Sequence, residues 1–321
     1  GAGYIGSHVV RQLGEAGYWV VVYDNLSTGH RWAVTHGELV VGDLADTEAL
    51  EALFSQHNFT AVLHFAAHIV VPESVTDPLK YYRNNTRNTL NLLATMDRYG
   101  VSRIVFSSTA AVYGMPDRQV LTEELPLAPI NPYGASKMMS ERMMMDLARA
   151  SDLTYVILRY FNVAGAEPRT RLGQATPAAT HLIKVACECA TGAREGMQIF
   201  GTDYATRDGT CIRDYIHVED LASAHVQALA YMEEGGDSRV LNCGYGRGFT
   251  VREVIGVVKR LSGVDFPVME TGRRAGDPEA LMADNTRIHA TLDWQPAYDD
   301  LETIVRTALD WERHWQAHRH S

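Results

Sequence analysis

The chain begins Gly1-Ala2-Gly3-Tyr4-Ile5-Gly6-Ser7-His8 and runs directly into apolar residues at helical spacing, and this stretch decides the fold. Gly3 and Gly6 fit the last two glycines of a G-x-x-G-x-x-G turn, whose first glycine would precede residue 1. Small residues at such a turn let the backbone approach a pyrophosphate, whose charge meets the N-terminus of the following helix. Glycine turns also cap helices for structural reasons alone. No initiator Met and no strand precede this turn, so we expect a chain clipped at its N-terminus, without the first strand of its sheet.

Outward from this turn, apolar runs of strand length alternate with segments of helical pattern. The run from residue 18 to 23 is continuously apolar, which is typical of a parallel strand buried on both faces. This alternation implies right-handed βαβ crossovers and an α/β fold with a doubly wound parallel sheet, the Rossmann type. We predict strands at 18–23, 39–41, 61–65, 104–106 and 155–158, and helices at 47–56, 79–99 and 133–150.

Beyond Asn162 the rhythm loosens into a loop rich in Gly, Pro and Arg at 165–177. We therefore predict a dinucleotide-binding Rossmann domain at 1–162 and a smaller α/β substrate domain at 163–321. The segment at about 214–244 is expected to return to the first domain. Helices are predicted at 181–191, 219–234, 250–262 and 301–317, with short strands near 199 and 240.

The composition excludes several classes of protein. With 29 Lys and Arg against 39 Asp and Glu, the net charge of −10 argues against binding nucleic acid or an acidic membrane through bulk charge. No run of eighteen or more apolar residues exists, so we predict no membrane span. The four cysteines are sparse, and Cys187 and Cys189 are poorly spaced for a shared zinc, so we expect reduced thiols, no metal and a cytoplasmic protein.

Two acidic residues at predicted strand ends support the dinucleotide hypothesis. Asp24 ends the second strand of the pattern, where a carboxylate can accept both ribose hydroxyls and repels a 2′-phosphate. Its alternative role is a solvated turn acid, but together with the glycines it favours NAD over NADP. Asp43, after the third strand, would lie at the adenine edge by the same geometry.

A second set of residues predicts chemistry at the same edge of the sheet. Tyr133 and Lys137 lie four apart on a predicted helix, and therefore on one face of it. A phenol has an ordinary pKa of about 10, so it needs nearby positive charge to act as a base at neutral pH. Lys137 and an oxidised nicotinamide would both supply that charge. We predict that Tyr133 is the general base and that Thr109 orients the substrate oxygen. An exposed helix pair is the alternative for an isolated Y-x-x-x-K.

At these residues the chain resembles the extended short-chain dehydrogenase/reductase family, and within it the UDP-hexose 4-epimerases. The matching blocks follow in order and cover essentially the whole chain: GAGYIGSH, SSTAAVYG, NPYGASK, LRYFN and GTCIRDYIHVEDLA. The resemblance implies a tightly held NAD, a UDP-galactose or UDP-glucose substrate, and interconversion of the two through a transient 4-keto sugar. It also implies a homodimer, formed through the Tyr133 helix and the long helix before it.

The resemblance further implies the residues that bind each ligand. For UDP, Arg213 and Arg274 are the natural partners of the diphosphate, since guanidinium matches phosphate oxygens in pairs. The remaining substrate residues are Thr109, Tyr133, Asn162, His181, Leu182, Phe200, Asp277 and Leu281. The NAD residues are Gly3, Tyr4, Ile5, Gly6, Asp24, Asn25, Ser27, Thr28, Asp43, Leu44, Phe65, Ala66, Ala67, Asn85, Ser107, Lys137 and Tyr160.

The chain departs from the family at three of these regions. Ile69 stands where some members carry a lysine near the cofactor phosphates, and His181 stands where some carry Asn. Leu281 stands where the family often has Tyr, a residue thought to limit room near the sugar 2-position. We therefore expect some turnover of UDP-N-acetylhexosamines.

Two alternatives to epimerisation stay open at the level of sequence. Sister enzymes of the same fold are sugar-nucleotide dehydratases and decarboxylases, and those that resemble 4,6-dehydratases need an Asp-Glu pair just after the catalytic hydroxyl. Ala110 and Ala111 occupy these positions here, which disfavours dehydration. A non-catalytic NAD-binding regulator would be expected to lose the Tyr133 and Lys137 pair, and both residues are present.

Overall fold

A computed structural model describes residues 1–274 and 276–318 of the chain. Its central element is a parallel four-stranded sheet in the order β10–β6–β4–β3. The longest pairing joins β4 and β6 over their full lengths, with Ile104 opposite Tyr155 and Thr109 opposite Tyr160. The strands are β3 (Val62–His64), β4 (Arg103–Thr109), β6 (Thr154–Tyr160) and β10 (Arg239–Cys243).

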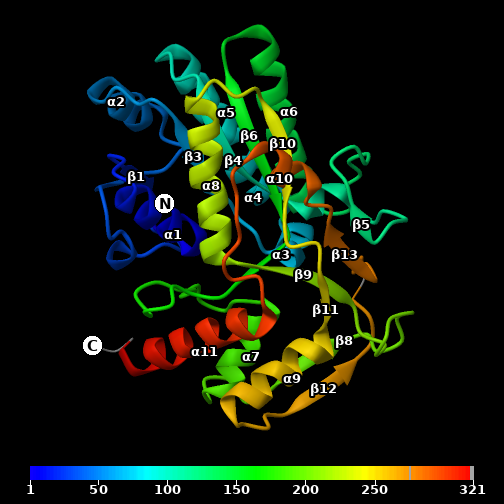
Figure 1. The fold of residues 1–321 in the computed structure, drawn as a ribbon. Helices are drawn as coiled ribbons and strands as arrows, with labels where there is room; N and C mark the ends of the chain where they lie inside the picture. Colours follow the sequence, from blue (N-terminus) through cyan, green and yellow to red (C-terminus); the bar gives the residue numbers. More distant parts are fainter. Residues whose placement is uncertain (275, 319–321) are drawn as a thin grey trace.

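Helices cover both faces of this sheet, as Figure 1 shows. Val105 and Val156 are buried in the core on the side of α8, whereas Ile104, Phe106 and Ile157 are buried in the core on the side of α5 and α6. Alternate residues of a strand point to opposite faces, so a continuously apolar strand serves two cores. The predicted doubly wound α/β fold is confirmed. One side carries α1 (Tyr4–Glu15) and α8 (Val218–Glu233), and the other carries α2 (Thr47–Gln56), α5 (Asn88–Arg98) and α6 (Pro132–Ala150).

The prediction of a strand at 18–23 buried on both faces was wrong. Strand β1 (Val21–Asp24) is shorter, and Val22 is its one buried residue. Among the described residues its single strand partner is β2 (Glu38–Val41), with which it forms a separate two-stranded parallel sheet. Trp19, within the expected strand, is 65% exposed. An apolar run therefore did not imply burial here, because no further strand of the described chain covers its other edge.

The predicted helix at 79–99 is built from several pieces. It follows α3 (Val71–Thr76) and consists of α4 (Pro78–Tyr81), the π-helical segment η2 (Tyr82–Arg87) and α5. π-Helical segments are rare and occur frequently at functional sites. Three short helices complete this part of the molecule and its flanks: η1 (Arg31–Ala33), η3 (Ala110–Tyr113) and α10 (Thr286–Thr291).

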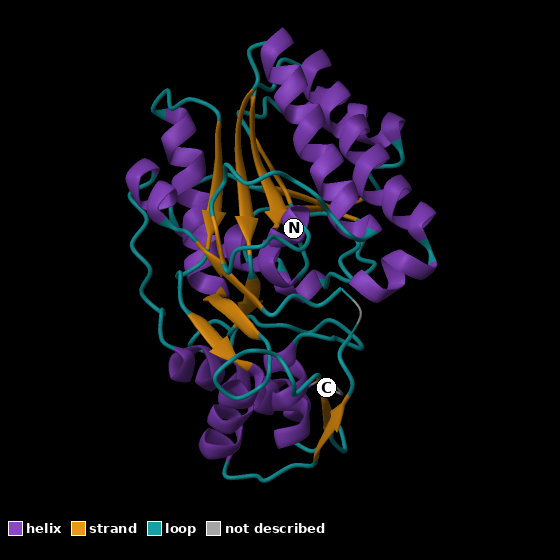
Figure 2. Cartoon of the chain, turned by 90° about the vertical axis from the view of Figure 1, so that its right-hand side faces the viewer, coloured by secondary structure: helices purple, strands orange, loops and turns teal. Residues whose placement is uncertain are grey.

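The short strands of the second half of the chain form two further sheets, which are visible below the central sheet in Figure 2. One has the order β11–β9–β13–β5, with β7 paired to β9 as well, and the other pairs β12 with β8. The strands are β5 (Val120–Leu121), β7 (Asn162–Ala164), β8 (Met197–Phe200), β9 (Ile212–His217), β11 (Gly248–Thr250), β12 (Val268–Thr271) and β13 (Ala280–Ala283). Helices α7 (Leu182–Ala190), α9 (Val251–Ser262) and α11 (Leu301–His318) pack together beside them.

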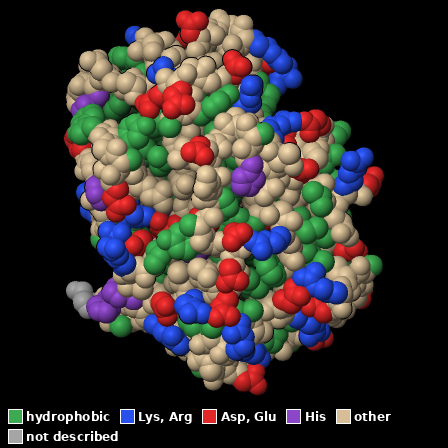
Figure 3. All heavy atoms as spheres, in the orientation of Figure 1, with side chains coloured by type: hydrophobic (Ala, Val, Ile, Leu, Met, Phe, Trp, Pro, Cys, Tyr) green, Lys and Arg blue, Asp and Glu red, His purple; other side chains and the backbone are tan. Residues whose placement is uncertain are grey.

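The outer surface carries mixed charge. On the face drawn in Figure 3, Lys and Arg side chains lie interspersed with Asp and Glu side chains. No helix in the described part of the chain combines the length and apolar character needed to cross a bilayer.

Candidate active site

The carboxyl ends of β4 and β6 bring polar side chains together at one edge of the sheet, where ligands bind in open α/β folds. Strand β4 ends in Ser107, Ser108 and Thr109, and β6 ends in Tyr160. The hydroxyls of Ser107 and Tyr160 are hydrogen-bonded to one another. The Tyr160 hydroxyl, predicted to bind the cofactor, is thus engaged with the strand end, and only 9% of the residue is exposed.

Helix α6 places Tyr133 in its first turn, next to the end of β4. Asn131 caps the helix, with Oδ1 accepting a hydrogen bond from Gly134 N at 2.9 Å, and Pro132 stands at the first helical position. A Cβ on Gly134 would lie 2.5 Å from the carbonyl oxygen of Ala111. Glycine at this position therefore permits the close approach that sets Tyr133 beside the catalytic strand end.

Tyr133 and Thr109 face each other. Thr109 caps η3, with its hydroxyl accepting a hydrogen bond from Ala111 N at 3.1 Å, so the side chain is fixed. Burial raises the pKa of the Tyr133 phenol, while hydrogen bonding with Thr109 acts in the opposite direction. In the free protein the phenol is therefore protonated at neutral pH, and it needs added positive charge to act as a base.

Lys137 lies one turn further along α6 and is only 3% exposed. Its Nζ donates a hydrogen bond to the Ser107 carbonyl oxygen at 2.8 Å and lies 4.8 Å from the centre of the Phe106 ring. Burial lowers the pKa of Lys137 to about 7, while Glu141 acts to raise it. The ammonium is directed to the strand end, rather than to the Tyr133 phenol, in this arrangement.

The π-helical segment positions Asn85 at the same place. Its Nδ2 donates to the His68 carbonyl oxygen and to Ser136 Oγ, each at 3.0 Å, and its Oδ1 accepts from His68 N at 2.8 Å. The Asn85 carbonyl oxygen accepts from the hydroxyl of Ser140 at 3.2 Å. This residue thereby ties the loop after β3 to the catalytic helix α6.

The glycine turn has the features of a phosphate cradle. Helix α1 begins after Gly3 with no side-chain cap and no acidic residue in its first turn, so its first N–H groups are free for a ligand. A Cβ on Gly6 would lie 2.9 Å from the Gly1 backbone, whereas one on Gly3 would meet nothing within 4 Å. The turn is close at Gly6 and open at Gly3, and a small pocket there is also lined by Tyr4 and Thr28. These residues fit a pyrophosphate.

The two acidic residues predicted for the adenosine end lie in neighbouring loops. Asp24 Oδ2 accepts from the nitrogens of Gly1 and Ala2 at 2.9 and 2.8 Å, and its Oδ1 accepts from Leu26 N at 2.9 Å. Asn25 Nδ2 donates to Asp43 Oδ2 at 2.7 Å, so the two strand ends are joined side by side.

The other residues expected at the cofactor lie around these loops. Tyr4 donates its hydroxyl to the Gly165 carbonyl oxygen at 2.6 Å, which connects α1 to the loop after β7. The Leu44 carbonyl oxygen accepts from Asn91. Ser27 N donates to Asn25 Oδ1 at 3.0 Å. Ile5 packs against the core on the α8 side, as does Phe65, and Ala66 and Ala67 follow β3 in the loop that Asn85 holds.

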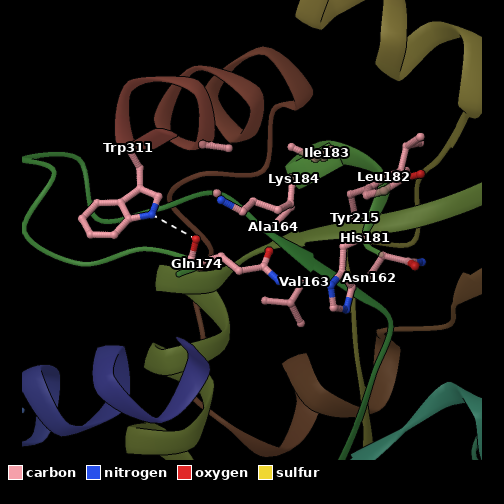
Figure 4. Close-up of a pocket in the computed structure, with 12 residues that line it drawn as sticks. Asn162, Val163, Ala164, Gln174, His181, Leu182, Ile183, Lys184, Tyr215 and Trp311 are labelled. Atoms are coloured by element: carbon pink, nitrogen blue, oxygen red, sulfur yellow. Dashed lines mark hydrogen bonds between the residues drawn. The ribbon is translucent and has the colours of Figure 1, made fainter. Parts of the chain in front are cut away.

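Three of the expected substrate residues line one pocket, drawn in Figure 4. They are Asn162, His181 and Leu182. Asn162 Nδ2 donates to the Asp214 carbonyl oxygen at 3.2 Å. Burial lowers the pKa of His181, so its ring is neutral at pH 7. Leu182 begins α7, which has no side-chain cap and no acidic residue in its first turn.

The remaining substrate residues form a second group on β9, β13 and the loops beside them. Arg213 makes an ion pair with Asp277, and the Arg274 guanidinium lies 4.1 Å from the centre of the Phe200 ring. Leu281 pairs with Arg213 in the register of β13 and β9. Because β9 also pairs with β7, which begins at Asn162, this one strand joins the two substrate groups.

Comparisons with known proteins place this geometry in context. A family model described as the NAD dependent epimerase/dehydratase family matches residues 1–244. The chain belongs to this family. Among curated relatives, it is 55% identical to a UDP-glucose 4-epimerase of Azospirillum brasilense over 98% of this chain and 90% of that one. It is 47% identical to a UDP-glucose 4-epimerase of Rhizobium leguminosarum bv. trifolii, over 100% of this chain and 97% of that one.

Solved structures of the epimerase/dehydratase family agree with this assignment and confirm the resemblance seen in the sequence. The UDP-glucose 4-epimerase from Brucella ovis in complex with NAD matches with a TM-score of 0.95 at 46% identity, covering 97% of this chain and 96% of that one. The UDP-Glc/GlcNAc 4-epimerase from Campylobacter jejuni matches with a TM-score of 0.86 at 52% identity, covering 98% of this chain and 97% of that one.

One part of this epimerase/dehydratase site was missed from the sequence, namely a buried polar network behind β4. Glu141 accepts from the Ser108 hydroxyl and pairs with Arg159 through two nitrogens, and only 3% of Arg159 is exposed. Arg159 also donates to the Tyr113 hydroxyl at 3.1 Å, which in turn donates to Asn242 Oδ1 at 2.7 Å. The available signal was the position of Glu141, one helical turn after Lys137 and therefore on the same face of α6.

Proposed function

We propose that this chain is an NAD-dependent 4-epimerase that interconverts UDP-galactose and UDP-glucose. The observation that carries the proposal is the set of Thr109, Tyr133 and Lys137 at the carboxyl end of β4, beside a glycine turn that fits a pyrophosphate. The relatives that match nearly the full length of the chain are named UDP-glucose 4-epimerases.

In the proposed reaction, Tyr133 removes the proton from the sugar 4-hydroxyl, which Thr109 holds in place. When bound, NAD supplies the acceptor, and later the donor, of the C4 hydride. Lys137 stabilises the phenolate form of Tyr133 through its charge, and the same phenol returns the proton after the 4-keto sugar has turned over. Atoms and electrons balance within one turnover, so no second oxidant is needed.

The nucleotide must be held firmly while the hexose turns. Arg213 and Arg274 are proposed to bind the diphosphate, with Asn162 and the first N–H groups of α7 on the opposite side. The Arg213 side chain is paired with Asp277 in this structure, so we propose that this pairing orients the guanidinium. These contacts touch UDP and leave the sugar free.

The dehydratase alternative has less support. Ala110 and Ala111 begin η3 directly after Thr109, and neither can deliver or accept the proton that elimination of water requires. A decarboxylase or a non-catalytic NAD-binding protein remains the competing assignment that an assay must separate.

A coupled assay tests the proposed function. Purified chain is given UDP-galactose with no added cofactor, and UDP-glucose formation is followed. Formation of UDP-glucose without net NADH is the expected result. Strict dependence on added NAD with accumulation of NADH would instead identify a dehydrogenase.

We also propose that Leu281 admits N-acetylated sugars. Leu281 packs against the cluster of Ala110, Val112 and Tyr113, directly beside Thr109. The C. jejuni enzyme named for both UDP-Glc and UDP-GlcNAc supports this proposal. Wild type should convert UDP-N-acetylgalactosamine, and Leu281→Tyr should lower that kcat/KM by roughly tenfold or more because one bulky ring removes the space. Turnover of UDP-galactose should change little.

The control for Leu281→Tyr is Leu281→Met, which conserves volume and should leave both activities near wild type. Both substrates are measured in parallel as kcat/KM. A wild-type enzyme that is active on UDP-galactose but inactive on UDP-N-acetylgalactosamine would contradict the proposal for Leu281.

We propose a homodimer formed through helices α3 to α6. Exposed apolar residues gather on these helices, and they include Val75 at 62%, Leu79 at 58%, Leu90 at 53% and Met139 at 40%. Sedimentation should give the mass of two chains for wild type and of one chain for Leu90→Glu, because an unpaired carboxylate would be buried at the interface. Val264→Glu, at an exposed position outside these helices, is the control. A dimeric Leu90→Glu variant would rule out this interface.

The proposed division of the chain follows the predicted one. We propose a dinucleotide domain at 1–162 and a substrate domain at 163–321, with about 214–244 returning to the first. The pairing of β10 with β6, and the packing of α8 on β4 and β6, support that return. The four cysteines are free thiols, which is consistent with the reducing cytoplasm that we propose as the location.

A further inference from the structure

We propose that Gln174 is a positioning residue that fixes the tautomer of His181, so that the ring presents Nε2–H to a phosphate oxygen of the nucleotide sugar. This inference rests on the proposed function, because it names a determinant of UDP binding at the pocket of Figure 4. Gln174 lies in the 165–177 segment, which the sequence had indicated only as a loop.

The contact between the two side chains decides the tautomer. Gln174 Nε2 donates a hydrogen bond to His181 Nδ1 at 3.0 Å, and Gln174 is 7% exposed. A neutral imidazole carries its proton on one nitrogen only. Since Nδ1 accepts here, the proton is on Nε2, and burial keeps the ring neutral by lowering the pKa of His181.

The backbone of Gln174 is itself held in place. Trp311 Nε1 donates to the Gln174 carbonyl oxygen at 3.2 Å, and a Cβ on the preceding Gly173 would lie 2.3 Å from the Trp311 ring. Trp311 in turn stacks with Trp32 and Trp315, each at a ring distance of 5.9 Å. Figure 4 shows Gln174 between Trp311 and His181. The donor is thus presented from a rigid wall rather than from a free loop.

The surroundings of His181 give the direction of the Nε2 donor its meaning. His181 precedes α7, lines the pocket together with Asn162 and makes no side-chain hydrogen bond that caps the helix. An uncapped helix N-terminus attracts anions. With Nε2–H the imidazole adds a donor to this group, whereas the other tautomer would turn a lone pair toward a phosphate oxygen and weaken binding.

Three variants separate tautomer control from simple packing. Gln174→Leu removes the donor at nearly constant size, and His181→Asn replaces the imidazole by a carboxamide, which has no tautomers. Gln174→Leu should raise KM for UDP-galactose roughly three- to tenfold with kcat nearly unchanged, since one hydrogen bond to the bound nucleotide is weakened. In the His181→Asn background the same change should alter KM less than about twofold. An equal KM change in both backgrounds would overturn the proposal.

A matched control and a second readout keep this test decisive. Gln295→Leu replaces an exposed glutamine whose amide contacts only Asp293 among its recorded partners, and it should leave KM unchanged. The imidazole ¹⁵N shifts of His181, assigned by comparison with His181→Asn, report the tautomer directly in the wild-type protein. We expect a protonated Nε2. A protonated Nδ1 would overturn the inference even if Gln174→Leu did not fold. Calorimetry with UDP separates the two levels, because absence of UDP binding refutes the proposed function and leaves the tautomer result standing.

Discussion

Tyr133→Phe should lower kcat for UDP-galactose by roughly 10²- to 10⁴-fold, the range that a positioned general acid–base group contributes. The phenyl ring can keep the packing of the native side chain, including the edge contact with Tyr81 at 6.4 Å between ring centres. The variant loses the one oxygen that faces Thr109. KM should change little, because the grip on UDP is made by other residues.

The control for this prediction is Tyr155→Phe. Tyr155 lies at the opposite end of β6 from the site, next to the α5 and α6 core, and its hydroxyl has no proposed role. It should retain wild-type kcat. Both variants are compared in the coupled assay after circular dichroism has shown that they are folded. A Tyr133→Phe enzyme within about tenfold of wild type would mean that another group removes the proton.

The parts of the fold that could be predicted are those set by local patterns. The helix over Pro132–Ala150 was expected at 133–150, because Asn131 and Pro132 begin it and helical spacing continues from there. The helix over Thr47–Gln56 was expected at 47–56, and Asp46 caps it through a 3.0 Å bond to Ala49 N. Capping and periodicity are both written within a few residues, so they can be read without tertiary information.

The short strands of the second half could not be predicted in the same way. Strand β9 pairs with β7, β11 and β13, whose residues come from three distant segments of the chain. Strands of three to six residues show little periodicity, and their pairing is decided by contacts that are remote in sequence. For the same reason the contact between Gln174 and His181, which arises from a loop, has no sequence pattern.

The chemistry of the site was partly predictable. The spacing of Tyr133 and Lys137 places both on one face of α6, but it does not say which acceptor the ammonium meets. In the structure that acceptor is the Ser107 carbonyl oxygen, because the end of β4 runs beneath the helix. The net charge of −10 likewise gave no information on where anions bind, since attraction depends on the helix N-termini and on individual arginines.

Lys137→Met should lower kcat roughly 10²- to 10³-fold, a loss similar to that of a preorganised donor at developing negative charge. The ammonium is the one protein cation that we assign to stabilising the Tyr133 phenolate, and methionine fills nearly the same space without charge. Lys259→Met is the matched control, because Lys259 also lies over a phenylalanine ring, at 5.2 Å, but is partly exposed and remote from the site. That control should retain wild-type kcat.

The same substitution should remove a pH dependence of stability, measured by urea unfolding of protein without bound nucleotide. Burial lowers the pKa of Lys137 from 10.5 to about 7. Between these values the unfolded chain keeps a proton that the folded chain has released, so rising pH favours the folded state, at up to about 1.4 kcal/mol per pH unit. Below pH 7 both states are protonated and the penalty for burying the charge is complete. The free energy of unfolding of wild type, minus that of Lys137→Met, should therefore rise from pH 7 toward pH 10. A flat or falling difference would show that Lys137 keeps its proton in the folded chain, and would assign it a charged resting state throughout the working range.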